Sequence, residues 1–483
     1  MSETMDSRTR WLALYVLCLA SLMIVLDVTI VGVALPSIRE DLGFSETSLA
    51  WVVNGYLLTY GGFLLLGGRL GDLFGHRRLF ILGISAFTVA SLACGLATTQ
   101  WFLVAARSVQ GLGGAVASAV SLSLMMGLFT EPADRAKAMG IFGFVASGGG
   151  SIGVLLGGIL TDTLNWHWIF LVNFPIGVLV VLLTLRLVPA LPAFAAGGRL
   201  DIAGAITVTG SLMLAVYAIV NGNEKGWTSA QTLGVLAASA VVFAAFLRIE
   251  SRVRVPLMPL RLFRLRNLST ASGVGVLWAA AMFAWFFMTA LYLQLVLDYT
   301  PLQIGLAFLP GNVIMGILSI GLSAKLVMRY GIKKPLTTGL LLASAGLALL
   351  VRAPVDGSFV VDVLPSMILL GLGAGMAFNP VLLAAMGDVE PAESGLASGV
   401  VNTSFMMGGA VGLAVLASVA ASRTNTLVDT GHGQIAALAG GYHLAFLIGA
   451  IFAAGAAVIG ATLLRESAPA PEEAHGAPAA ECA

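Results

Sequence analysis

The chain has 483 residues, of which 58% are hydrophobic and only 10% are charged. Soluble domains carry about 25% charged residues, so this composition excludes an ordinary soluble protein and indicates an integral membrane protein. The net charge of +1 gives no reason to expect a nucleic-acid partner, and the three cysteines, Cys18, Cys94 and Cys482, suggest neither a disulfide framework nor a metal site.

Apolar runs long enough to cross a bilayer recur along the whole chain, which predicts an all-α polytopic membrane protein. The first run is too long for a signal-peptide core and no small-residue cleavage site follows it, so we expect an uncleaved first span. The fourteen predicted transmembrane helices are 11–36, 48–68, 79–97, 101–129, 137–162, 166–189, 201–220, 231–249, 268–296, 301–327, 335–352, 360–385, 394–421 and 440–465.

Basic residues between these spans predict the orientation of the protein. Twenty Lys and Arg residues fall on one side, and only Arg39, Lys225, Arg352 and Arg423 fall on the other. Basic loops stay in the cytoplasm, so we expect a multi-pass protein of the cell membrane with both termini cytoplasmic. The sequence has no Gly-x-x-x-x-Gly-Lys-Ser/Thr phosphate loop, so we expect no ATPase and no cofactor, and any pumping must use an ion gradient.

A glycine pattern repeats weakly at an offset near 260 residues: Gly140, Gly149 and Gly153 recur as Gly399, Gly408 and Gly412. The repeat pairs spans one to six with spans nine to fourteen and leaves two spans between them. Parallel six-helix repeats place a transport path between the halves. We therefore expect an N-terminal six-helix bundle over 1–190, an inserted two-helix hairpin and cytoplasmic strap over 191–260, a C-terminal six-helix bundle over 261–465, and a disordered cytoplasmic tail over 466–483.

An acid lies deep in the first predicted span. Asp27, in the stretch LDVTIVGVALP, sits about 13 Å along the helix from Pro36 and about 24 Å from Trp11, well inside a hydrocarbon core about 30 Å thick. A charge there costs about 2.5–3.5 kcal/mol on insertion scales, and burial favours its protonated form. We interpret Asp27 as a proton-coupling residue. A carboxyl group bonded to Thr29 or to another helix for structural reasons is the alternative.

A buried arginine is expected in the fourth span, within RSVQGLGGA. Arg107 needs an acidic, carbonyl or water partner, and we interpret it as part of proton coupling with Asp27. The alternative is snorkelling, because Arg107 lies only about 9 Å along the helix from Trp101, at the extracellular end.

The loop GGRLGDLFGHRR closes the second span and predicts a cytoplasmic gate. Its glycines allow a tight turn and close helix approach, and its acid can pair with an arginine in one conformation and release it in another. An ordinary basic loop is the alternative. The gating residues that we expect are Gly68, Asp72, Gly75, Arg77 and Arg78.

Glycines along the fifth span predict a ridge that another helix can approach closely. Such packing can seal one side of a pathway, and simple helix packing is the alternative. The ridge consists of Gly140, Gly149, Gly153, Gly157 and Gly158. Polar and aromatic residues in other spans are candidates for lining a substrate cavity: Asn54, Tyr56, Gln110, Trp285, Gln294, Asn379 and Asn402.

Five stretches together resemble the fourteen-span drug:proton antiporter family of the major facilitator superfamily, in the expected order and over nearly the whole chain to about residue 465. They are LDVTIVGVALP, GRLGDLFGHRR, RSVQGLGGA, NWHWIFLVNFPIG and PLMPLRLFRLRN. The resemblance implies two six-helix bundles, alternating access and proton-driven export of lipophilic drugs, dyes or antibiotics. It also implies protonation at Asp27, proton transfer at Arg107, cytoplasmic gating at Asp72 and a span-five antiporter signature at Gly149, Gly153, Gly157 and Gly158.

Two departures from the family pattern qualify these expectations. Val154 follows Gly153 where the span-five signature has a proline, and Gly32 stands where the first-span signature often has an asparagine. The expected protein is therefore not an enzyme but a monomeric exporter whose partners are a lipophilic small molecule of cationic or neutral type, protons and the lipid bilayer. A proton-coupled importer on the same fold is the first alternative, and a channel or receptor is the second.

Overall fold

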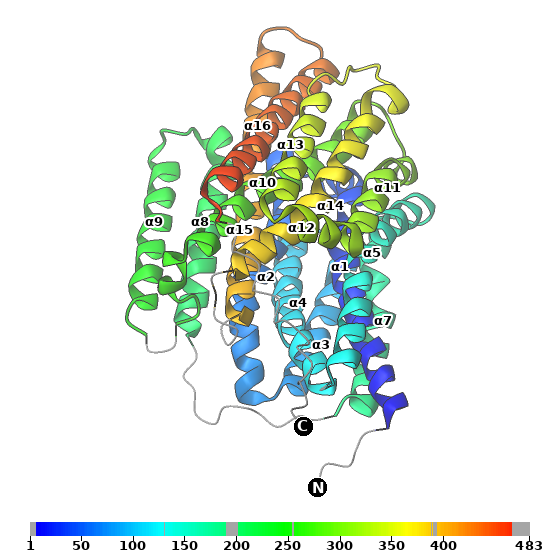
Figure 1. Ribbon diagram of the computed structural model, residues 1–483. Helices are drawn as coiled ribbons and strands as arrows, with labels where there is room; N and C mark the ends of the chain where they lie inside the picture. Colours follow the sequence, from blue (N-terminus) through cyan, green and yellow to red (C-terminus); the bar gives the residue numbers. More distant parts are fainter. Residues whose placement is uncertain are drawn as a thin grey trace, which may run out of the picture.

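The computed structural model describes residues 6–129, 131–189, 201–253, 256–387, 389 and 394–465. Within these ranges the chain is helical and has no strand (Figure 1). Eleven of the described helices are long and apolar enough to cross a membrane, and two shorter apolar segments, Ile152–Thr163 and Pro301–Ile317, accompany them. The predicted all-α membrane architecture is confirmed, while the number of fourteen spans stays a prediction. The expected tail over 466–483 lies outside the described residues.

The N-terminal half follows the predicted spans closely. Gly43 caps the C-terminal end of α1 with a φ of +67°, which suits glycine, and Ser45 caps the N-terminal end of α2, where its hydroxyl accepts a hydrogen bond from the Ser48 N–H. The predicted span 166–189 corresponds to the apolar segment Trp168–Leu187, in which the turn residue Val172 separates α6 from α7. The helices are α1 (Ser7–Leu42), α2 (Glu46–Phe74), α3 (His76–Gly95), α4 (Gln100–Leu128), α5 (Pro132–Thr163), α6 (Trp168–Leu171) and α7 (Asn173–Leu187).

The C-terminal half contains two irregular turns inside predicted spans. The predicted helix 301–327 is interrupted by the π-helical turn Leu318–Leu322, where the Ser319 carbonyl accepts a hydrogen bond from Asn379 at 3.0 Å. The π-helical turn Phe359–Val363 precedes α14. The helices are α10 (Arg266–Leu295), α11 (Pro301–Ile317), α12 (Ser323–Tyr330), α13 (Lys333–Leu350), α14 (Leu364–Met386), α15 (Ser394–Asp429) and α16 (Gln434–Leu463).

Two further helices, α8 (Ile202–Lys225) and α9 (Ala230–Glu250), stand at one side of the molecule (Figure 1). Helix α8 contacts both α2 and α15, one helix from each half, whereas α9 packs mainly on α8. Asn223 and Ser418 join α8 to α15 through a hydrogen bond of 2.6 Å to the Ser418 carbonyl. The pair α8–α9 therefore lies beside the seam between the halves.

The two halves pack their helices in the same way. Helix α1 packs on α5 as α10 packs on α15, and α3 packs on α4 as α13 packs on α14. Between the halves, α5 contacts α11 and α2 contacts α15. The turns before α3 and α13 also correspond, since Gly75 and Gly331 have φ of +92° and +75°. These pairings follow the offset of the glycine repeat and leave α1 and α10 facing each other between the halves.

Candidate functional site

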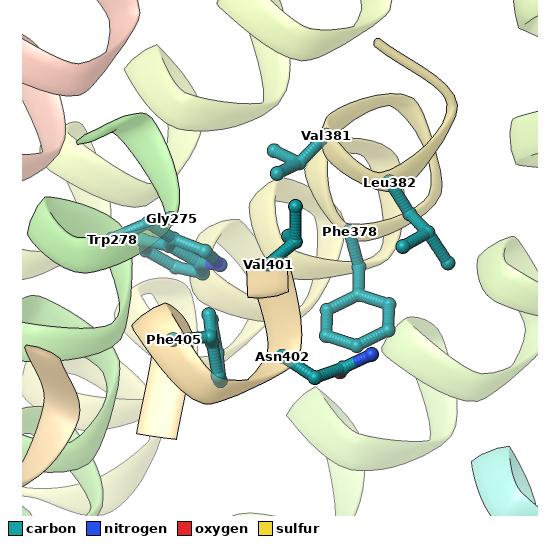
Figure 2. A pocket seen from close by; sticks show the side chains of 8 residues that line it. All are labelled: Gly275, Trp278, Phe378, Val381, Leu382, Val401, Asn402 and Phe405. Atoms are coloured by element: carbon teal, nitrogen blue, oxygen red, sulfur yellow. The ribbon is translucent and has the colours of Figure 1, made fainter. Parts of the chain in front are cut away.

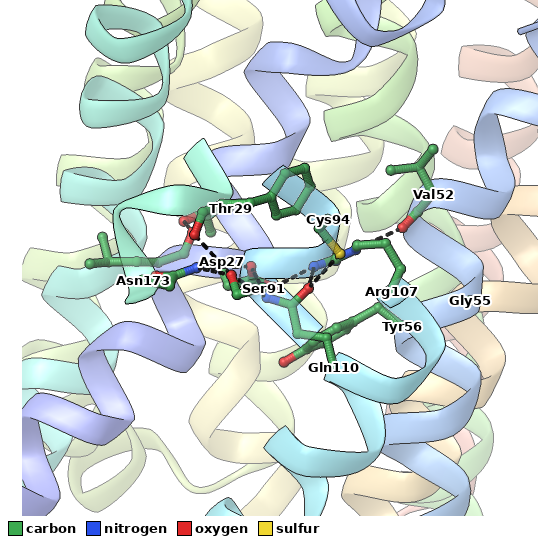
Figure 3. A network of polar contacts seen from close by, with 12 residues as sticks. Asp27, Thr29, Val52, Gly55, Tyr56, Ser91, Cys94, Arg107, Gln110 and Asn173 are labelled. Carbon is green, nitrogen blue, oxygen red and sulfur yellow. Dashed lines mark hydrogen bonds and ion pairs between the residues drawn. The ribbon is translucent and has the colours of Figure 1, made fainter. Parts of the chain in front are cut away.

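Asp27 and Arg107 form a buried ion pair in the interior of the N-terminal half. Nη1 of Arg107 donates to Oδ2 of Asp27 at 2.5 Å, and the exposed fractions of the two side chains are 2% and 0% (Figure 3). Asp27 lies on α1 and Arg107 on α4, so the pair joins two helices. Burial removes both charges from water, and their mutual attraction offsets part of that cost. The snorkelling interpretation of Arg107 is therefore wrong.

The guanidinium group of Arg107 has further partners on two helices. Its Nε donates to the Val52 carbonyl on α2 at 3.0 Å, and its Nη1 also donates to Oε1 of Gln110 at 2.7 Å. The Tyr56 ring lies 4.4 Å from Cζ of Arg107, and the Phe170 ring lies 5.5 Å away. Aromatic faces stabilise a cation at these distances. Arg107 thus keeps partners even without Asp27.

Neutral donors hold the other oxygen of Asp27. Nε2 of Gln110 donates to Oδ1 at 2.6 Å, and Nδ2 of Asn173 donates to the same oxygen at 3.2 Å. Both amides also donate to Oγ of Ser91 at 3.0 Å, and that hydroxyl donates to the Phe170 carbonyl. Thr29 does not take part, because its hydroxyl donates to carbonyls of its own helix. The proposed structural bond from Thr29 to Asp27 is therefore absent.

Three members of this cluster were not expected from the sequence. Ser91 and Cys94 come from α3, and Asn173 is the first residue of α7. Cys94 donates from Sγ to Oε1 of Gln110 at 3.6 Å. The sequence does contain one indication of Asn173, because its amide side chain lies inside an apolar run, within NWHWIFLVNFPIG. Asn173 directly follows Val172, the turn residue that separates α6 from α7.

The glycines of α5 pack directly against the segment that carries Asp27. A Cβ on Gly149 would lie 3.0 Å from the Leu22 side chain, and one on Gly153 would lie 3.1 Å from the Leu26 carbonyl. Gly157 makes the same approach to Ile30 at 2.8 Å, whereas Gly158 faces Pro301 of α11, in the other half, at 2.8 Å. The ridge therefore contacts both α1 and the opposite half. The side-chain position of Gly140 lies outside the described residues.

The segment predicted as a gating loop is almost wholly helical: Gly68 and Asp72 lie in α2, Arg77 and Arg78 lie in the first turn of α3, and only Gly75 separates the two helices. Gly75 makes the turn with its φ of +92°, but Gly68 has open space around its Cβ position, so it is not a point of close helix approach. Nη2 of Arg77 donates to the Leu185 carbonyl near the end of α7 at 2.5 Å, while Arg78 is exposed. The side chain of Asp72 lies outside the described residues, so its pairing stays a prediction.

The residues predicted to line a substrate cavity lie in several places. Tyr56 and Gln110 belong to the Asp27 cluster, and Asn54 is fully buried with both amide atoms unpartnered among the described residues. Trp285 packs in an aromatic group with Phe286 and Phe308. Gln294 is partly buried near the end of α10, and Asn379 bonds to the π-helical turn.

Asn402 lines a small cavity between helices of the C-terminal half. The cavity lies among α10, α14 and α15, and Figure 2 shows the Asn402 amide beside the Phe378 ring. Its other lining residues are apolar or aromatic: Gly275, Trp278, Val381, Leu382, Val401 and Phe405. Its volume of about 30 Å³ has room for only one or two water molecules and is far below that of a drug-binding pocket.

Sequence comparison places these features in a family. The model of the Major Facilitator Superfamily matches residues 17–413. The protein belongs to this superfamily. It is 38% identical to the puromycin resistance protein pur8 of Streptomyces alboniger over 94% of the chain and 90% of that protein. It is 36% identical to the cephamycin export protein CmcT of Amycolatopsis lactamdurans over 99% of the chain and 98% of that protein.

The solved structures agree on the fold of this superfamily member. A bacterial homologue of the human lysosomal transporter Spinster, in an inward-facing and unoccupied conformation, superposes with a TM-score of 0.66 at 15% identity, covering 94% of this chain and 97% of that one. The expectation that the protein is a transporter and not an enzyme is confirmed by the family and by its relatives. In this major facilitator, the Asp27 cluster lies wholly in the N-terminal half and the Asn402 cavity in the C-terminal half.

Proposed function

We propose that this protein is a proton-driven exporter of lipophilic drugs or antibiotics that works by alternating access. The observation that carries the proposal is the ion pair of Asp27 and Arg107, since a titratable carboxylate held inside a membrane helix bundle has a high cost and marks a proton path. The relatives named for puromycin resistance and cephamycin export support the cargo class and the direction of transport.

Protonation of Asp27 removes the negative charge that faces Arg107. The ion pair then becomes a weaker neutral contact, while Arg107 retains the Val52 carbonyl, Gln110 and the Tyr56 ring. Helices α1 and α4 lose their strongest link and are free to shift relative to each other. Loss of the proton to the cytoplasm restores the pair. The cluster thereby gives two arrangements whose balance depends on one proton.

One proton supplies enough energy for this task. Moving a single charge through 100 mV yields about 2.3 kcal/mol. At 1.4 kcal/mol per tenfold, that energy sustains roughly a fifty-fold gradient of a neutral cargo. The proton gradient is then the only energy source, and no cofactor is needed. The cargo enters from the cytoplasm or the inner leaflet.

The proposal includes a specific topology. Fourteen spans, with α8 and α9 as an inserted hairpin, place both termini in the cytoplasm, and the protein acts as a monomer in the cell membrane. The excess of Lys and Arg in one set of loops supports this orientation. The proton-coupled importer, which was the first alternative, requires several polar groups for a hydrophilic solute. The relatives named for puromycin resistance and cephamycin export favour export over import.

Transport by the full-length protein in proteoliposomes tests the proposal. A pH gradient should drive puromycin or a lipophilic dye against its concentration gradient, and the cargo should in turn stimulate proton movement. Asp27→Asn should fold and lose gradient-driven transport. Asp298→Asn is the matched control, because Asp298 is exposed and its φ of 57° suits asparagine equally well. Full pumping by the Asp27→Asn variant would contradict the role of this residue.

A further inference from the structure

The helix pair α8–α9 touches both halves of the protein, but its hydrogen bonds to other helices go to the C-terminal half. Nδ2 of Asn223 on α8 donates to the Ser418 carbonyl on α15 at 2.6 Å. The Ser418 hydroxyl donates in return to the Ile219 carbonyl on α8 at 3.2 Å. The two hydrogen bonds are reciprocal and lie one turn apart on α8, so they fix its position along α15.

The end of α9 is attached to the same half. Oε2 of Glu250, the last residue of α9, accepts a hydrogen bond from the Met258 N–H at 3.1 Å. Met258 precedes the short 3-10 helix Leu260–Arg264, and the chain then enters α10 at Arg266. Residues of α8, α9, this connecting segment, α10 and α15 also line one apolar groove together, to which no described residue of α1–α7 contributes.

The contact of α8 with α2, in the N-terminal half, is of a different kind. Gly62 of α2 faces Thr209 of α8 so closely that a Cβ on Gly62 would lie 3.0 Å from the Thr209 Cβ. The Thr209 hydroxyl is buried and has no hydrogen-bond partner among the described residues. The hydrogen bonds that described side chains of α8 and α9 make outside their own helix go to each other, to the connecting segment or to α15. Helix α2 therefore meets α8 without a directional bond from these side chains.

We propose that α8 and α9 move as one body with the C-terminal half and that α2 slides along α8 when the two halves rock. The inference rests on the alternating access of the proposed function. Moving α8 along α15 would break the two reciprocal hydrogen bonds, whereas a shift of α2 at the contact of Gly62 with Thr209 breaks none. The pair is then a fixed cover on α15, and the moving boundary on this side of the protein lies between α2 and α8.

Distances between spin labels in the full-length protein, in phosphatidylcholine nanodiscs, test the proposal. Three exposed positions take the labels as cysteine variants: Glu40 near the end of α1, Lys225 at the end of α8 and Thr426 near the end of α15. A Cys482→Ser background leaves the buried Cys18 and Cys94 as the other thiols. The labels are measured in pairs by double electron–electron resonance, at acidic and at neutral pH and without any cargo.

The three distances give different outcomes. Between the two pH values, the label at Glu40 should change its distance to Lys225 and to Thr426 together, while the distance from Lys225 to Thr426 stays constant. If Lys225 instead kept its distance to Glu40 and changed its distance to Thr426, the pair would move with the N-terminal half, which overturns the inference and leaves the proposed function standing. If the distance from Glu40 to Thr426 were the same at both pH values, the proposed alternating access would itself be contradicted.

Matched variants test the attachment of α8 without any need for motion. Asn223→Ala removes the hydrogen bond to α15 and should broaden the distribution of distances between the labels on α8 and α15. Asn221→Ala is the control on the same helix, because Asn221 donates to a carbonyl of α8 itself. Asn223 also accepts a hydrogen bond from the Trp227 indole, so Trp227→Phe, which removes that bond alone, should keep the narrow distribution. An unchanged distribution in Asn223→Ala would show that this bond does not hold the pair on the C-terminal half.

Discussion

Gln110 donates a hydrogen bond from Nε2 to Oδ1 of Asp27 at 2.6 Å, on the carboxylate oxygen opposite the one that binds Arg107. Its Oε1 accepts from Arg107 at the same time. One amide therefore contacts both members of the ion pair. The Gln110 side chain therefore holds the carboxylate and the guanidinium group in a fixed relative orientation, since it donates a hydrogen bond to the first and accepts one from the second.

Gln110→Leu should lower the stability of the protein and shift the pH dependence of transport. The substitution leaves a buried carboxylate oxygen and an arginine N–H each short of one partner, which costs about 1–3 kcal/mol of stability. We expect a lower melting temperature and a shifted pH profile of dye transport in proteoliposomes. Ser121→Ala, on the same helix, is the control, because the Ser121 hydroxyl bonds only to its own helix. A pH profile identical to that of the wild type would limit Gln110 to a structural role.

The sequence predicts which residues are costly to bury but not which of them meet. Asp27 and Arg107 stand out because each is charged within an apolar run, and both lie in the site. Asn173 and Ser91 do not stand out, since neutral polar residues are common in membrane helices and their rotation about the helix axis is set by packing.

The residues predicted to line a substrate cavity also show that the sequence does not reveal which side chains lie close together. Tyr56 and Gln110 contact Arg107 and Asp27, and their place beside a substrate stays a prediction. Asn402 was placed in the same set and does line a cavity. Their sequence contexts are alike, a polar side chain among apolar neighbours. Only the relative position of the helices distinguishes a residue that faces a buried charge from one that faces open space.

Gly153→Ala should destabilise the protein and impair transport. The added methyl group would meet the Thr29 hydroxyl and lie 3.1 Å from the Leu26 carbonyl, which forces α5 away from α1 next to Asp27. Overpacking of this kind costs about 1–3 kcal/mol. Gly150→Ala is the control on the same helix, since its nearest contact is an ordinary 3.8 Å to Thr29. Measurements of thermal unfolding in detergent, and of dye transport, should distinguish the two variants. Equal melting temperatures would show that α5 can move away from α1 at no cost in stability.

Gly158→Leu should weaken the contact between the two halves without affecting the Asp27 cluster. Its Cβ position lies 2.8 Å from the Pro301 carbonyl at the start of α11, so a larger side chain holds α5 and α11 apart at this end. We expect slower transport and faster hydrogen exchange over residues 301–310. Gly455→Leu, which has open space around it, should match the wild type. Unchanged exchange in the Gly158 variant would mean that this contact does not close the pathway.

Arg77→Ala should reduce stability and transport more than Arg78→Ala. Arg77 donates to the Leu185 carbonyl, one of the last carbonyls of α7, which the helix itself leaves without a donor, whereas Arg78 is exposed. Loss of this charge-assisted bond should cost about 1 kcal/mol and loosen α7, the helix that brings Asn173 to Asp27. The two variants remove the same charge from the first turn of the same helix, so any difference in melting temperature or transport rate reports the contact and not the charge. If the two variants had equal effects, these arginines would act only through their charge, which sets the orientation of the protein in the membrane.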